Sequence, residues 1–199
     1  MDSRDTRGTA NVDTVVKLGG GLLAHAVHFD AALAMIEVAA TSRQLLIVPG
    51  GGPFADAVRD VDRRLKLADD VTHWMAVLAM DQHAHLIAGK LARAVVVAEP
   101  REIADVLGAR TVGCVPVLAP YRWLREADPL PHSWDVTSDS IAAWVAARVG
   151  ARRLVLVKPP GATGSRLVDA CFARVLPAHI TPSIVSADRI DLLDAALRA

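Results

Sequence analysis

Short apolar runs alternate with longer stretches of helical character along the chain. Residues 14–18 and 44–48 are apolar and each run ends in a glycine cluster, which predicts two buried strands followed by glycine loops. Residues 30–40 between them are mostly apolar and start with Asp30, a residue type that caps helices. The first unit is therefore predicted to be a strand, a helix and a second strand.

The same alternation continues to the end of the chain. Gly150 stands where a helix C-cap glycine is expected, and Ser186 or Asp188 where an N-cap is expected. Strands that alternate with helices favour an α/β fold, a three-layer αβα sandwich with a mostly parallel central sheet and ligands at the carboxyl ends of its strands. The further strands are predicted at 94–98, 114–118, 154–157 and 183–185, and the further helices at 101–107, 139–149, 165–175 and 188–197.

Two segments depart from this simple pattern. Residues 72–91 are long enough for a helix, but apolar side chains spread around much of its circumference, so we expect it to be largely buried or to lie at a subunit interface. Residues 116–131 are rich in proline and are predicted to be a loop region near the site.

Composition narrows the class of protein. The 199 residues are 52% hydrophobic, which suits one core, and Lys plus Arg equals Asp plus Glu at 22 each. Because no basic stripe occurs, a small ligand is favoured over nucleic acid. No apolar run approaches a membrane span, and the two cysteines, Cys114 and Cys171, suit reduced thiols. We expect a cytoplasmic protein with a flexible segment at 1–12 and a single domain at 13–199.

The first glycine loop follows a lysine. Lys17 stands near the end of the first predicted strand, directly before Leu18 and the glycines 19–21. Glycines let phosphate oxygens approach backbone N–H groups, and a lysine at a buried strand end needs an anion nearby. A lysine that only extends to solvent is the alternative.

The second glycine loop has the form of an anion site. Residues 49–55 read Pro-Gly-Gly-Gly-Pro-Phe-Ala, and Pro53 suits the first turn of a helix, so free N–H groups converge on one point. A tight turn is the alternative. The sequence contains neither a Walker A loop nor the dinucleotide fingerprint, which disfavours a dinucleotide-dependent oxidoreductase.

A third polar element lies late in the chain. Thr137 or Ser138 can cap the helix predicted to follow, and Asp139 lies in its first turn. This carboxylate could hold Lys17 or, through Mg²⁺, a nucleotide phosphate. An ordinary helix cap is the alternative reading.

The three elements together resemble the amino acid kinase family, with its carbamate kinase-like fold. The likeness rests on Lys-x-Gly-Gly at the first strand, Gly-Gly-Gly after the second and a Thr-Ser-Asp-Ser turn before a late helix. Residues 49–56, 73–82 and 134–139 also resemble the branch that phosphorylates aminomethylfuranmethanol phosphate in the synthesis of methanofuran-type cofactors.

This resemblance implies transfer of the γ-phosphoryl group of ATP, with Mg²⁺, to a phosphomonoester. Lys17 would bridge the transferred group, Asp139 would orient Lys17 and the metal-nucleotide, and no general base or metal-binding side chain is expected. Kinship also implies a homo-oligomer. The implied nucleotide-binding residues are Gly19, Gly20, Gly21, Ser138, Lys158 and Gly161, and the implied acceptor-binding residues are Gly50, Gly51, Gly52, Asp56 and His73.

The chain departs from the family pattern on the nucleotide side. Residues 158–161 read Lys-Pro-Pro-Gly where members have Thr-Asp-x-Asp/Ser-Gly, Gly21 stands where Ser is common, and the usual Gly-Met-x-x-Lys segment is absent. Lys158 could replace the missing lysine. The alternative function is a non-catalytic phosphate-binding or subunit-organising relative of the kinases.

Overall fold

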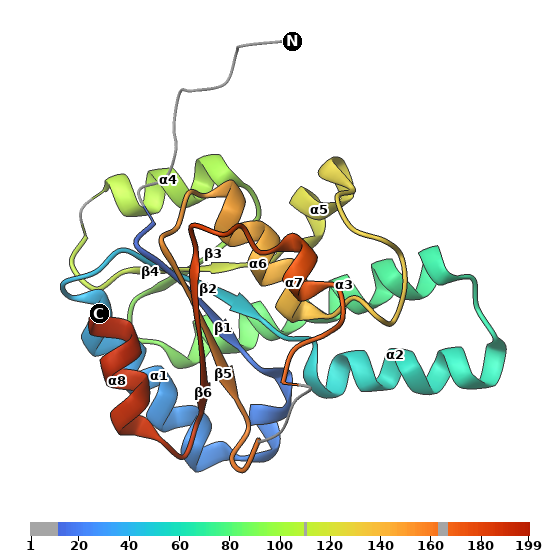
Figure 1. Cartoon of the computed structure of the whole chain (residues 1–199), viewed down its shortest axis with the longest axis horizontal. Coiled ribbons are helices and arrows are strands. Elements are labelled where there is room, and N and C mark those ends of the chain that lie inside the picture. The colour runs from blue at the N-terminus through green and yellow to red at the C-terminus, as the bar shows by residue number, and fades with distance from the viewer. Residues whose placement is uncertain (1–11, 110, 163–166) are drawn as a thin grey trace, which may run out of the picture.

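Six parallel strands form one sheet at the centre of the molecule (Figure 1). The computed structural model describes residues 12–109, 111–162 and 167–199. The order in the sheet is β3-β4-β2-β1-β5-β6, and every described pair of neighbouring strands is parallel. The strands are β1 (Thr14–Leu18), β2 (Leu45–Pro49), β3 (Ala94–Val97), β4 (Val115–Leu118), β5 (Arg153–Lys158) and β6 (Thr181–Ser186).

Helices cover both faces of the sheet, which confirms the predicted αβα sandwich. Alternate strand residues point to opposite faces, so Val16 and Leu18 pack in one core and Val15 in the other. Helices α1 and α8 pack on the first face, and α4 and α6 on the second. The helices are η1 (Gly20–Ala24, a 3₁₀ helix), α1 (Ala26–Ala40), α2 (Gly52–Leu65), α3 (Asp69–Lys90), α4 (Pro100–Gly108), α5 (Tyr121–Ala127), α6 (Ser138–Arg148), α7 (Phe172–Val175) and α8 (Ile190–Arg198).

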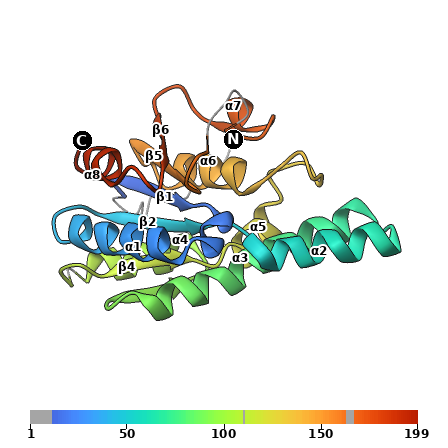
Figure 2. The same ribbon diagram turned by 90° about the horizontal axis from the view of Figure 1, so that it is seen from below.

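Helices α2 and α3 form a hairpin that extends away from the sheet, as both views show (Figures 1 and 2). Helix α3 contacts β2, β3 and β4, and the buried residues of this helix include Val77, Met80 and Ile87. Leu78 on the same helix is exposed. The helix expected at 72–91 is therefore present but only partly buried within one chain.

Three predictions were wrong in detail, two of helix caps and one of a loop. Asp30 lies inside α1 instead of capping it, because the chain runs from η1 through His25 directly into the helix. Residues 116–131 are not all loop, since they contain α5. The N-cap of α8 is Arg189, whereas Ser186 forms a hydrogen bond to Asp188.

The helix expected at 165–175 is the largest miss, because only α7 forms within the described part of that range. The carboxylate of Asp169 accepts hydrogen bonds from the N–H groups of Cys171 and Phe172, and this contact starts the helix late. Residues 163–166 lie outside the described residues. So do residues 1–11 of the flexible segment expected at 1–12. The single-domain assignment of 13–199 stays a prediction.

The strand register brings the predicted loops together. Leu18 of β1 pairs with Pro49 of β2 on one side and with Val157 of β5 on the other. The three strands therefore end at the same level, and the segments that follow them share one edge of the sheet. No helix in the described part of the chain is both long and apolar enough to cross a membrane.

Candidate active site

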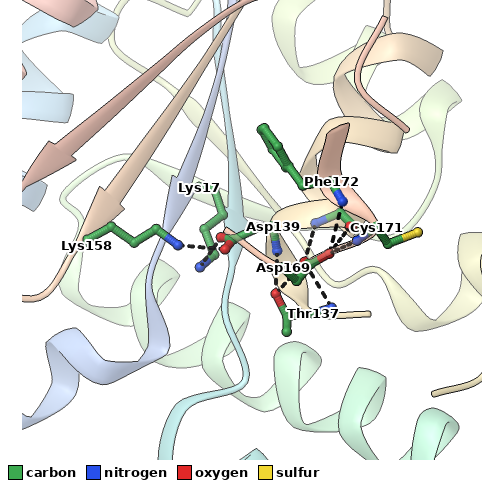
Figure 3. A network of polar contacts seen from close by, with 8 residues as sticks. Lys17, Thr137, Asp139, Lys158, Asp169, Cys171 and Phe172 are labelled. Atoms are coloured by element: carbon green, nitrogen blue, oxygen red, sulfur yellow. Dashed lines mark hydrogen bonds and ion pairs between the residues drawn. The ribbon is translucent and has the colours of Figure 1, made fainter. Parts of the chain in front are cut away.

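Two lysines hold one buried carboxylate at this edge (Figure 3). Asp139, in the first turn of α6, has Oδ1 at 2.8 Å from Lys17 Nζ and Oδ2 at 2.6 Å from Lys158 Nζ. The Lys158 contact is also a hydrogen bond, whereas the Lys17 contact is an ion pair without hydrogen-bond angles. When all three groups are ionised, the cluster carries one excess positive charge, which attracts an anion.

Burial and charge shift the ionisation of this cluster in identifiable directions. Burial lowers the pKa of Lys17, and the attraction of Asp139 does not fully offset it. Burial alone would raise the pKa of Asp139, but the ammonium groups of Lys17 and Lys158 outweigh it and hold that pKa below its usual value. Asp139 is therefore ionised at neutral pH, and a phosphate near Lys17 would favour the charged form of that lysine.

The two glycine loops lie directly against each other beside the cluster. A Cβ atom on Gly20 would lie 2.0 Å from the backbone nitrogen of Gly52, and one on Gly50 would lie 2.5 Å from the nitrogen of Gly20. The N–H of Gly50 donates to Leu18 O at 2.7 Å. Any side chain at Gly20 would separate the loops, so the glycine residues are required for this contact.

The altered loop after β5 packs on the first glycine loop. A Cβ on Gly21 would lie 2.9 Å from Pro159 Cγ, and one on Gly19 would lie 2.8 Å from Val157 O. The two departures from the family pattern therefore belong together, because the space that a serine side chain would occupy at position 21 is occupied by Pro159.

A cavity of about 300 Å³ opens beside the glycine loops, between α2, α3 and the start of α6. The amino-terminal end of α2 faces it, and the first turn of a helix has N–H groups without intrahelical acceptors. The remaining wall combines polar and apolar side chains. Its lining comprises Gly20, Gly21, Gly51, Gly52, Ala55, Asp56, Arg59, Thr72, His73, Ala76, Val77, Met80, Ser133, Trp134, Val136, Thr137, Ser138 and Ile141.

Trp134 fastens one wall of the cavity to α2. Its indole N–H donates to Asp62 Oδ2 at 2.9 Å, and the Arg59 guanidinium lies 4.6 Å from the ring centre. Arg59 also pairs with Asp56 at 3.0 Å. These contacts join the segment before α6 to the hairpin, so α2 and α6 enclose the cavity between them.

Other predicted site residues lie at different distances from the cluster. Asp56 and His73 line the cavity. Ser138 lines the cavity too, although it was predicted to bind the nucleotide. Its Oγ would lie 3.2 Å from a Cβ atom on Gly50, a residue of the predicted acceptor site. Gly161 is exposed, is not part of the cavity lining and has positive φ, a turn geometry that suits glycine. The binding roles of these residues stay predictions.

Asp169 organises the site but was missed in the sequence (Figure 3). Its carboxylate accepts from the N–H and Oγ of Thr137 and of Ser140, in addition to the two α7 amides. Thr137 also caps α6 as expected, its Oγ1 accepting from Asp139 N at 3.3 Å. Asp169 thereby fixes the helix start that carries Asp139. No local sequence signal marked this role, because the sequence predicted a helix over 165–175.

The residues present fit a bound triphosphate. The two glycine loops, where an added Cβ would clash with neighbouring backbone, lie beside two buried lysines that share one carboxylate. Free backbone N–H groups and ammonium groups are suitable partners for phosphate oxygens. Both oxygens of Asp139 are taken by lysines, and the described residues contain no group of three or more His, Cys, Asp or Glu that could hold a metal. Mg²⁺ would thus be held mainly by the phosphates of the nucleotide.

Comparison with known proteins agrees with this geometry. Residues 14–159 match the Amino acid kinase family, and the chain belongs to that family. A [5-(aminomethyl)furan-3-yl]methyl phosphate kinase from Methanocaldococcus jannaschii is 24% identical over 174 residues, which are 87% of this chain and 78% of the relative. The family and this relative support a kinase that transfers a phosphoryl group.

Solved structures show the same fold. The uridylate kinase from Archaeoglobus fulgidus has a TM-score of 0.69 at 16% identity, over 94% of this chain and 96% of its own. The UMP kinase from Ureaplasma parvum has a TM-score of 0.70 at 16% identity, over 92% of this chain and 94% of its own. The architecture is therefore that of the amino acid kinase fold.

Proposed function

We propose that this protein transfers the γ-phosphoryl group of ATP to a phosphomonoester, aminomethylfuranmethanol phosphate, and forms its diphosphate. The observation that supports this most strongly is the Lys17–Asp139–Lys158 cluster beside two glycine loops in contact. Two anion sites in contact suit a reaction in which both reactants carry phosphate. The relative from Methanocaldococcus jannaschii supplies the acceptor in this proposal.

The named residues act by positioning and by charge. In the transfer, the bond between the γ-phosphorus and its bridging oxygen breaks, a bond to an acceptor phosphate oxygen forms, and ADP leaves. Lys17, in β1 shortly before the first glycine loop, neutralises the charge of the transferred group, and Lys158 adds charge on the nucleotide side. Because the attacking oxygen is already ionised, no general base is needed. Bound Mg²⁺ would neutralise charge on the nucleotide phosphates.

The cavity suits a small ring carrying a phosphate and an amine. The start of α2 and Arg59 present groups that favour a phosphate, and Met80, Val77 and Ile141 offer an apolar wall for a ring. Asp56 at the rim offers a carboxylate for an ammonium group. We therefore infer that the acceptor binds with its phosphate against residues 50–52.

A second function stays open, that of a phosphate-binding relative without catalysis. The observation that favours it is the Lys158-Pro159-Pro160-Gly161 loop, in which Pro159 lies against Gly21 and narrows the space on the nucleotide side. This alternative predicts phosphate binding without ATP turnover. It also accommodates a role in organising subunits, and α3, with its exposed Leu78, is the proposed contact face of a homo-oligomer.

The test is calorimetric titration of the purified protein with MgATP, followed by a transfer assay with aminomethylfuranmethanol phosphate and with UMP. We expect saturable ATP binding, a diphosphate product from the furan substrate and less from UMP. The Lys17→Ala variant should abolish turnover, whereas Lys90→Ala, which removes an exposed lysine paired with Asp30, should not. A folded protein that binds no ATP would contradict the kinase and support the non-catalytic relative.

A further inference from the structure

His83 of α3 is completely buried and contacts the second glycine loop. Its exposed fraction is 0%, and its Nδ1 lies 2.6 Å from the carbonyl oxygen of Gly50. A carbonyl oxygen accepts hydrogen bonds, so Nδ1 carries the hydrogen and donates it. Nε2 is buried without a partner among the described residues.

The surroundings of His83 keep its ring neutral. Burial lowers the pKa of His83, Lys17 lowers it further, and the hydrogen bond to Gly50 opposes this shift. In the neutral ring only one nitrogen carries hydrogen, and the contact with Gly50 selects Nδ1. His83 is therefore a fixed hydrogen-bond donor at neutral pH.

The bond from His83 determines the direction of a neighbouring amide. The carbonyl of Gly50 and the N–H of Gly51 belong to one planar trans peptide unit, and in such a unit they point in opposite directions. A carbonyl held toward His83 thus directs the Gly51 N–H away from His83, which is not part of the cavity lining. Gly51 lines the cavity where the acceptor phosphate is proposed to bind.

This peptide unit needs an external restraint. It lies between two glycines, which offer little steric resistance to rotation of the unit. The other side of Gly50 is already fixed, because its N–H donates to Leu18 O at 2.7 Å. The bond from His83 holds the side that carries the Gly51 N–H.

We propose that His83 is a positioning residue for the acceptor phosphate, which it serves by holding the Gly50 carbonyl so that the Gly51 N–H faces the bound anion. This inference rests on the proposed function, since it assumes that residues 50–52 bind phosphate. His83 touches neither substrate and acts only through the glycine loop.

Three variants separate this role from simple packing. In His83→Asn the side-chain amide nitrogen takes the place of Nδ1 and keeps the donor, whereas in His83→Gln it takes the place of Nε2. His83→Leu removes the donor altogether. His85→Leu is the matched control, because His85 is an exposed histidine on the same helix.

The measurement is NMR titration of the Gly51 amide with inorganic phosphate, accompanied by calorimetric titration with MgATP. We expect phosphate to shift the Gly51 signal in the wild type and in His83→Asn, and to bind about tenfold more weakly to the Leu and Gln variants. The MgATP Kd should change less than twofold in all variants, and His85→Leu should match the wild type.

Two results would overturn the inference. One is phosphate binding in the Gln and Leu variants as tight as in the wild type. The other is the absence of a Gly51 shift in the wild type, which would leave no anion for His83 to position. The MgATP titration and the transfer assay report on the kinase separately, so its failure is distinguishable from that of the His83 role.

Discussion

Lys158 and Asp139 form a direct ion pair at 2.6 Å, although Lys158 is the last residue of β5 and Asp139 lies in the first turn of α6. The side chain of Lys158 is only 12% exposed, so this lysine is directed into the molecule. The Lys-Pro-Pro-Gly sequence, which departs from the family pattern, therefore supplies a charge to the cluster at Lys17.

We predict that Lys158→Met lowers kcat about 100-fold or more, as the loss of one preorganised cation at a phosphoryl transfer site does. Lys17→Met should have a similar or larger effect. Asp139 keeps one lysine in either variant, so no carboxylate is left buried without a cation and the fold should persist. ADP release measures kcat and thermal denaturation checks the fold. Wild-type kcat in Lys158→Met would show that this lysine has no role in the reaction.

Gly20→Ala tests the contact between the two glycine loops. The new Cβ would lie 2.0 Å from Gly52 N, so the backbone must move, and we expect a loss of about 3 kcal/mol or more in the free energy of unfolding. Gly89→Ala is the matched control, because Gly89 is an exposed residue of α3 and a Cβ there would meet nothing within 4 Å. That variant should gain about 0.5–1 kcal/mol from helix propensity. Urea denaturation measures the free energy of unfolding of both variants. Equal values for Gly20→Ala and Gly89→Ala would contradict the close contact between the two glycine loops.

Trp134→Ala should weaken acceptor binding more than ATP binding. The variant removes a cavity wall together with its bond to Asp62 and its contact with Arg59. We expect the KM for the acceptor to rise about tenfold, the equivalent of one hydrogen bond plus a partly exposed cation–π contact. The KM for ATP should change less than twofold. Arg63→Ala, a substitution at an exposed position of α2, serves as the control. An unchanged acceptor KM in Trp134→Ala would mean that the acceptor binds elsewhere.

His73 should be neutral when the protein functions. Burial lowers its pKa to about 4, His132 contributes to the lowering and Asp128 opposes it. The folded state then binds fewer protons than the unfolded state between pH 4 and the ordinary value of 6.5, so His73 contributes stability that is lost as the pH falls through this window. His73→Asn should lose less stability than the wild type between pH 7.5 and 5 in urea denaturation. An NMR titration that gives His73 an ordinary pKa would contradict this expectation.

The neutral state of His73 also limits its role at the acceptor. A neutral ring donates one hydrogen bond and carries no charge to attract a phosphate. The stacked ring of His132, 4.3 Å away between centres, constrains its orientation further. His73 therefore fits better as a polar wall for the acceptor than as its phosphate ligand.

The sheet, the glycine loops and the helix that carries Asp139 could all be predicted from the amino-acid sequence. These features are local, because apolar periodicity, glycine clusters and a Thr cap act within a few residues of one another. The parallel direction of the strands then followed from their alternation with helices, and it placed the candidate loops at the same end of the strands. Lys17, Asp139 and the two loops could be named for this reason.

The side chains that support those loops could not be predicted, because they are brought there by tertiary packing. His83 and Gly50 are 33 residues apart, Trp134 and Asp62 are 72 apart, and Asp169 lies 32 residues from Thr137. A histidine, a tryptophan or an aspartate carries no local pattern that names such a partner. Their contacts arise from how the hairpin of α2 and α3, the start of α6 and the irregular segment before α7 pack together, and packing depends on the whole chain.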